Sequence, residues 1–166
     1  MNERKYTAGQ VARALRLPLT AFRTWARRGY LGFPETETEG QWRKFSAQDV
    51  ARLAAIANLT AQGLSVSDAA EVIDCPITGP DYWHAMVERG DEHIFVCVER
   101  RAGDTIRSEI FPDASSVKIF LTEPMEGCQV GTDDADQVNH RPVYRSVFDV
   151  GPAVVAAVAE VKAQPK

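Results

Sequence analysis

The chain has 166 residues, of which 45% are hydrophobic and 25% charged, so it can bury a core and is not a disordered protein. Its net charge of −4 is unevenly distributed. Residues 1–75 carry ten basic and eight acidic side chains, a net +2, whereas residues 76–166 carry nine and fifteen, a net −6. We expect neither a membrane span nor a signal peptide, because no apolar run has the required length, and we therefore predict a cytoplasmic protein.

The first predicted elements are two short helices separated by a tight turn. Thr7 is a suitable N-cap for a helix that runs to about Leu15, and Arg16, Leu17 and Pro18 end it. The next helix covers about residues 19–28 and is stopped by Gly29. This pattern predicts a helix-turn-helix, with an ordinary helical hairpin as the alternative that the segment alone leaves open.

The second of these helices has two chemically different faces. Phe22, Trp25 and Ala26 lie on one side. The other side carries hydroxyl and cationic side chains, namely Thr20, Arg23, Thr24 and Arg27. Residues 4–34 contain seven basic residues and no acidic one, which predicts a surface that faces phosphate. Short helices of this kind place side chains in the major groove of DNA.

Residues 35–45 alternate glutamate with threonine, turn at Gly40 and continue into a basic segment. The alternation predicts a small two-stranded wing, from which Trp42, Arg43 and Lys44 would face the DNA backbone. Ser46 then caps a third helix, with Asp49 in the matching position of a capping box. A fourth short helix begins at Ser65 or Ser67.

Taken together, residues of these elements resemble the winged helix-turn-helix of the MerR family of transcription regulators. In chain order the residues that carry the resemblance are Tyr6-Thr7, Val11-Ala12, Phe22-Arg23-x-Trp25, Gly29-Tyr30-Leu31, Gly40-x-Trp42-Arg43-x-Phe45-Ser46, Asp49-Val50, Leu53, Ile56, Leu59, Gly63-Leu64-Ser65 and Ala69. The resemblance covers about residues 5–74. It implies that the second helix enters the major groove and that Arg23 and Arg43 touch the DNA backbone.

The chain departs from the family pattern in two places. Arg16 stands where the family has its turn glycine, and Pro18 stands where it has a cap serine. The long helix through which these regulators dimerise should follow the fourth helix, but residues 74–80 are too rich in proline and glycine to begin one. We therefore predict a domain boundary here, with a DNA-binding domain at 1–75 and an acidic domain at 76–166.

The second predicted domain is α+β, as is the whole chain. A short helix over 81–88 precedes three strands of an antiparallel meander, at His93–Glu99, Thr105–Phe111 and Val117–Thr122. The first of these strands is apolar on both faces and should be central. Residues 123–142 form an acidic loop, read as solvated rather than as a calcium site. A fourth strand at 143–148 and a helix from Gly151 to Ala163 follow. We expect the valine stripe of that helix to pack on the sheet, and the alternative is that it joins two subunits.

No catalytic, metal-binding or cofactor-binding motif is present in the sequence, so we predict no enzyme, no cofactor and no metal. Three cysteines lie far apart at positions 75, 97 and 128. They are predicted to be structural thiols, and a thiol or metal sensor is the alternative.

The predicted function is a bacterial or phage transcription regulator that binds double-stranded DNA in a sequence-specific way as a homodimer. Arg13, Arg16, Arg43 and Lys44 would add backbone contacts to those of the second helix. The acidic domain would supply dimerisation or bind a small-molecule or protein effector. Two alternatives are a DNA-binding factor of the phage excisionase or terminase small-subunit type, and an adaptor or antitoxin that acts through the acidic domain.

Overall fold

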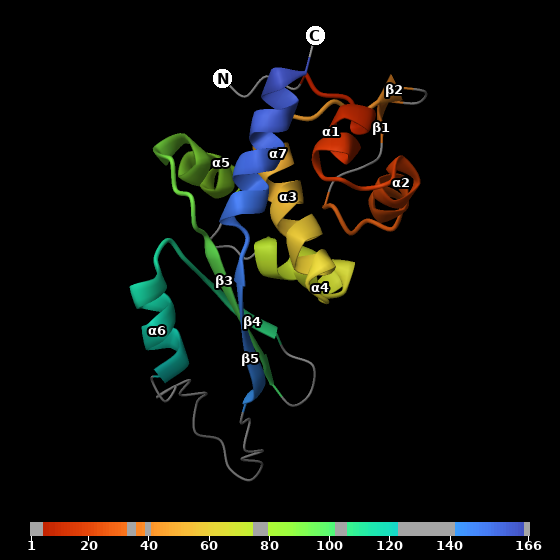
Figure 1. Ribbon diagram of the computed structural model, residues 1–166. Helices are drawn as coiled ribbons and strands as arrows, with labels where there is room; N and C mark the ends of the chain where they lie inside the picture. The colour runs from red at the N-terminus through yellow and green to blue at the C-terminus, as the bar shows by residue number, and fades with distance from the viewer. Residues whose placement is uncertain are drawn as a thin grey trace.

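The computed structural model describes residues 5–32, 36–38, 41–74, 80–101, 106–122 and 142–164. Figure 1 shows two parts in contact, a cluster of helices and a small sheet that extends from one end of it. The long helices α3 (Ala47–Ala61) and α7 (Gly151–Ala163) lie side by side at the centre of the cluster. The fold is α+β, as predicted.

The first two helices are joined by a turn that contains a left-handed residue. Helix α1 (Ala8–Ala14) begins with a capping box, in which the Gln10 amide donates to Thr7 Oγ1 at 3.3 Å and the Thr7 amide donates to Gln10 Oε1 at 2.9 Å. Helix α2 (Leu19–Arg27) follows Pro18 and ends before Gly29, whose φ of +76° permits the chain to leave the helix. The predicted pair of helices is confirmed.

A short hairpin separates α2 from α3. Strands β1 (Thr36–Thr38) and β2 (Gln41–Trp42) pair antiparallel. Phe45 then forms an isolated bridge with Tyr6, and its amide donates to the Tyr6 carbonyl at 2.8 Å. Ser46 and Asp49 form the predicted capping box at the start of α3. Ser65 caps α4 (Val66–Ile73).

The rest of the chain contains a three-stranded antiparallel sheet with the order β4-β3-β5. Its elements are α5 (Pro80–Arg89), β3 (Phe95–Arg101), β4 (Ile106–Phe111), α6 (Ala114–Thr122), β5 (Pro142–Asp149) and α7. Strand β3 pairs with both neighbours, so its predicted central place is confirmed. The Ser108 hydroxyl of β4 donates to the Val72 carbonyl at 3.4 Å, which joins the sheet to α4.

The prediction of a third meander strand at 117–122 is wrong, because these residues belong to α6. Asp113 begins that helix: its carboxylate accepts the Ser116 amide at 2.9 Å and the Ser116 hydroxyl at 2.8 Å. A cap of this kind favours the helix over the alternating apolar pattern that suggested a strand. Helix α6 contacts β3 and β4 and covers one side of the sheet (Figure 1).

Helix α7 packs mainly against α3 and α1 rather than against the sheet, which differs from our expectation. Its stripe of Val154, Val158 and Val161 is at most 1% exposed. One continuous apolar core therefore includes Val11 of α1, Ile56 of α3 and these valines. The elements that resemble a DNA-binding domain share their core with the last helix of the chain.

Candidate nucleic-acid interface

Helix α2 is oriented by its apolar face. Phe22 is 2% exposed and Ala26 is 8% exposed, and the Phe22 ring meets the Phe45 ring edge-on at a centroid distance of 5.6 Å. Burying an aromatic ring of this size is worth roughly 1.5–3 kcal/mol and holds the helix in one rotation about its axis. The opposite face of α2 is thereby turned outward.

That outward face gathers the four predicted residues of α2. Thr20 and Arg27 are exposed, and Arg23 and Thr24 are partly exposed. The Thr24 hydroxyl donates to the Thr20 carbonyl within the helix at 2.9 Å, whereas the Thr20 hydroxyl has no such bond among the described residues. Residues at these spacings share one face of a helix, so the surface combines one available hydroxyl with two guanidinium groups.

The first turn of α2 leaves backbone donors available. Pro18 occupies the N-cap and supplies no side-chain hydrogen bond, while the Phe22 amide donates to the Pro18 carbonyl at 3.1 Å. The earlier amides of a helix have no partner within it, and they attract anions such as phosphate. This end of α2 can therefore hold a DNA phosphate.

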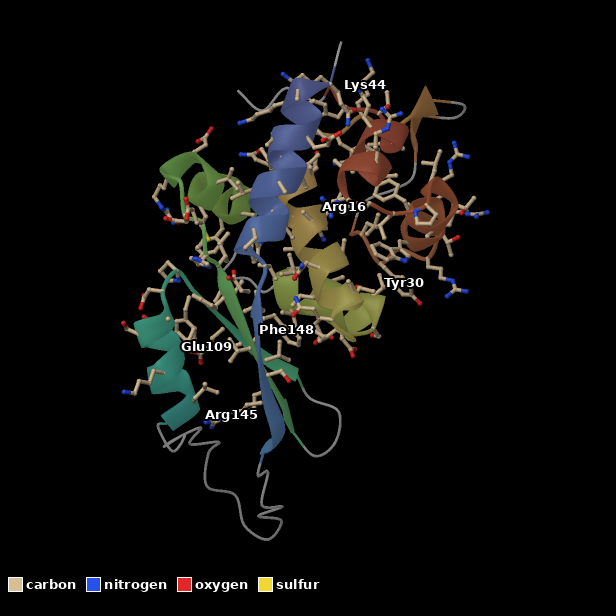
Figure 2. The ribbon with its side chains drawn as sticks, viewed as in Figure 1. Arg16, Tyr30, Lys44, Glu109, Arg145 and Phe148 are labelled. Atoms are coloured by element: carbon tan, nitrogen blue, oxygen red, sulfur yellow. The ribbon has the colours of Figure 1, made fainter. Side chains whose placement is uncertain are left out.

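Arg13 and Arg16 are both exposed, but Arg16 also borders a groove in the protein surface. It lines a groove of about 520 Å³ formed by the turn after α1 together with α3 and α7. Figure 2 shows Arg16 where the turn meets α3 and α7, away from the outward face of α2.

The three predicted residues of the hairpin are placed differently from one another. Lys44 is exposed, at the same end of the molecule as β1 and β2 (Figure 2). Arg43 does not project as expected: it is 8% exposed, its Nη2 lies 3.6 Å from Asp49 Oδ1, and its guanidinium lies 5.9 Å from the centre of the Phe45 ring. The side chain of Trp42 lies outside the described part of the chain. Arg43 thus joins the hairpin exit to the first turn of α3.

A buried arginine that our sequence analysis missed stabilises the region behind α2. Arg52 of α3 is 9% exposed, forms a bidentate ion pair with Asp74, and donates to the Leu31 carbonyl at 2.8 Å. It ties the chain after α2 to the end of α4. The sequence contained a signal for this buried ion pair. Arg52 lies on the same helical face as Ile56 and Leu59, and a charge at a core position requires a buried partner.

The described residues offer little for a metal or thiol sensor. No group of three or more histidine, cysteine or acidic side chains in the described ranges is placed to hold a metal ion. Cys97 is buried, and burial, with a smaller effect of Glu109, raises the pKa of its thiol to about 11. Such a thiol stays protonated at neutral pH and is a poor nucleophile. Cys75 and Cys128 lie outside the described residues.

Residues 6–74 match the family model described as MerR HTH family regulatory protein. The match runs from Tyr6 to Asp74 and so includes every element from α1 to α4. This part of the chain is therefore a MerR HTH family domain, which implies a DNA-binding transcription regulator. No match was found among curated proteins. Within the described ranges, no helix has the length and hydropathy that crossing a membrane requires.

Proposed function

We propose that the protein is a sequence-specific regulator of transcription in which α2 enters the major groove of double-stranded DNA. The observation that carries this proposal is the outward face of α2, with its hydroxyl and guanidinium groups, in a domain of the MerR HTH family. An α-helix fits the major groove, where each base pair presents a distinct pattern of donors and acceptors. Residues 1–75 would read the DNA, and residues 76–166 would support that domain and its assembly.

Each predicted residue has a proposed role except Arg16, which lines the groove between the turn after α1, α3 and α7. Thr20 reaches a base edge, while Arg23 and Arg27 hold the phosphates on either side of the groove. Arg13 and Lys44 extend the phosphate contacts, and the hairpin at residues 35–45, with Trp42, lies along the backbone. Arg43 positions the hairpin against α3 through Asp49 instead of touching DNA. The Thr24 hydroxyl is held against the helix by its hydrogen bond to the Thr20 carbonyl, so Thr24 presents its methyl group to the DNA.

The protein would act as a homodimer. One helix-turn-helix reads too few base pairs to define a single site in a genome, and regulators of this size place two copies on two half-sites.

The test is a measurement of DNA affinity over a range of salt concentrations. Arg27→Ala and Lys44→Ala should weaken binding to all sequences alike and reduce the slope of log affinity against log salt by about 1 each, because one phosphate contact is lost. Arg89→Ala, which removes the same charge from α5, is the matched control and should change neither quantity. Equal affinity of Arg27→Ala, Lys44→Ala and the unmodified protein at fixed salt would contradict the proposal.

Sequence recognition needs a separate measurement. Selection of bound sequences from random DNA should give a two-fold symmetric site, and Thr20→Ala should relax the preference at one position in each half-site. A selected pool with no preferred sequence would contradict sequence-specific regulation while leaving DNA binding in place.

A further inference from the structure

The groove beside Arg16 has the size of a small-molecule site and a lining that is mainly apolar. Its volume of about 520 Å³ lies within the range of roughly 300–1,000 Å³ that is usual for ligand pockets. More than half of the residues that line it are alanines, and Leu15, Leu17 and Pro152 complete the apolar surface. Such a surface favours contact with a hydrocarbon group over contact with water.

The groove follows the direction of α3, which lies beside α7 (Figure 1). Ala54, Ala57 and Ala61 of α3 recur at steps of three and four residues, so they lie on one face of the helix. At a rise of 1.5 Å per residue this alanine row is about 10 Å long. Because alanine side chains are short, the row leaves a channel between the helices that a narrow aliphatic chain can fill.

The polar groups at the groove are hydrogen-bond donors. Arg16 is exposed, is the charged residue of the lining, and its guanidinium has no hydrogen bond or ion pair within the described part of the chain. Asn58 also lines the groove, and its side-chain oxygen accepts the side-chain amide of Gln62, which leaves its own NH₂ group as a donor. No acidic side chain is among the described residues of the lining. The groove is therefore complementary to a single negative charge.

We infer that this groove binds a small amphipathic monocarboxylate, with its carboxylate on Arg16 and its aliphatic body along the alanines of α3 and α7. A guanidinium matches the geometry of a carboxylate through two parallel hydrogen bonds. A phosphate monoester carries nearly two negative charges at neutral pH, and one arginine would balance it less well. The site goes beyond the proposed function and does not depend on it.

The backbone around Arg16 holds its side chain at the edge of the groove. Arg16 has a left-handed conformation, its amide donates to the Arg13 carbonyl at 2.9 Å, and the Leu17 amide donates to the Ala12 carbonyl at 2.9 Å. The turn is thus fixed on both sides of this residue. A side chain that begins from a fixed point loses less entropy when it binds a ligand, and strained backbone positions are frequent at ligand sites.

The test is calorimetric titration of the full chain, without DNA, with octanoate at concentrations at which this acid is monomeric. Octanoate has an extended chain whose length is comparable to that of the alanine row. It should bind in a saturable way to one site per chain. Octan-1-ol has the same chain length without the charge, and it should bind at least about tenfold more weakly because it cannot form an ion pair with Arg16.

Three variants test the placement of the ligand. Arg16→Gln should weaken octanoate binding at least about tenfold and leave octan-1-ol binding nearly unchanged, because only the charge is removed. Arg13→Gln removes the same charge from a residue of α1 outside the groove lining, so it is the matched control and should change neither affinity. Ala57→Leu should abolish binding of both probes by filling the channel. The circular dichroism spectrum of each variant checks that it is folded.

Four outcomes would overturn the inference. Absence of saturable octanoate binding would assign the groove to another occupant, such as an apolar side chain of a partner protein. Unchanged octanoate affinity in Arg16→Gln, or binding retained in Ala57→Leu, would place the acid elsewhere on the protein. Equal affinity for octanoate and octan-1-ol would contradict recognition of the carboxylate. A protein that binds octanoate as expected but has no affinity for DNA would instead contradict the proposed function and leave this site standing.

Discussion

Arg16 adopts a left-handed backbone conformation, with a φ of +54°, in the turn between α1 and α2. This is the position at which the resembled family has glycine. A left-handed conformation costs an ordinary L-residue roughly 1–2 kcal/mol, which glycine avoids. The Arg16 side chain lines the groove beside α3 and α7. We therefore attribute the presence of a strained arginine at this position to its side chain.

This strain leads to a prediction about two substitutions that remove the same charge. Arg16→Gly should be more stable than Arg16→Ala by about 1 kcal/mol, because both lose the guanidinium but only glycine relieves the backbone. Urea unfolding at one fixed protein concentration measures the difference. Equal stability of the two variants would show that the turn is not strained.

A second prediction concerns the pH dependence of stability. His93 Nδ1 donates to Asp149 Oδ2 at 2.6 Å, and this hydrogen bond, together with the carboxylate charge, raises the pKa of His93 above its usual value. The folded state therefore favours charged His93, and its stabilising effect is complete below the unfolded pKa of about 6.5 and is lost as the pH rises through the raised folded pKa. The urea midpoint of the unmodified protein should fall over this range relative to that of His93→Gln. Parallel curves for the two proteins would contradict this account.

At the scale of elements, the contact between α7 and the start of β3 depends on the absence of a side chain. A Cβ at Gly151 would lie 2.5 Å from the Glu92 carbonyl oxygen and 2.7 Å from the Ile94 amide nitrogen. Both neighbours are backbone atoms and cannot rotate away. Asp149 Oδ1 accepts the Gly151 amide at 3.1 Å and the Ile94 amide at 3.3 Å, so a single carboxylate joins the two chain segments.

The corresponding prediction compares two glycines in helices. Gly151→Ala should destabilise the fold by at least about 2 kcal/mol, because α7 must move away from the chain before β3. Gly9→Ala in α1 should stabilise it by roughly 0.5–1 kcal/mol, because the added methyl meets nothing within 4 Å and alanine favours a helix. Thermal unfolding of both variants provides the measurement, and a tolerated Gly151→Ala would contradict the close approach.

Local signals in the sequence were sufficient to locate most elements and one face of the candidate site. Caps such as Thr7 and Ser46 act within a few residues, so they are visible in the sequence and are confirmed by the structure. The outward face of α2 follows from helical spacing around Phe22.

Features that depend on how side chains and elements pack together could not be predicted in the same way. Arg43 is buried because its guanidinium lies close to the Asp49 carboxylate and the Phe45 ring. The sequence after a hairpin does not show whether a basic side chain has such partners or points into solvent. The valine stripe of α7 shows that one side of the helix is covered but not which element covers it. Residues 117–122 form a helix although their apolar residues alternate, and the Asp113 cap that favours this helix did not enter the prediction.

At the scale of the whole molecule, the shared core predicts a single cooperative unfolding transition. Val158 of α7 is 1% exposed within the cluster that also contains α1 and α3. Val158→Ala should cost about 2 kcal/mol and should increase amide hydrogen exchange in α3 as much as in α7. Lys162→Ala, an exposed change in the same helix, is the control. Exchange that rises in α7 while α3 stays protected would indicate separate units.

The place of α7 in the chain has a consequence for biosynthesis. A ribosome releases α1 and α3 long before it has made Gly151–Ala163, yet these three helices close one core. Until translation has reached α7, the surfaces of α1 and α3 that this helix covers in the finished protein are therefore exposed. Chains interrupted before this helix would contain the whole segment that matches the family model but would lack one helix of the core.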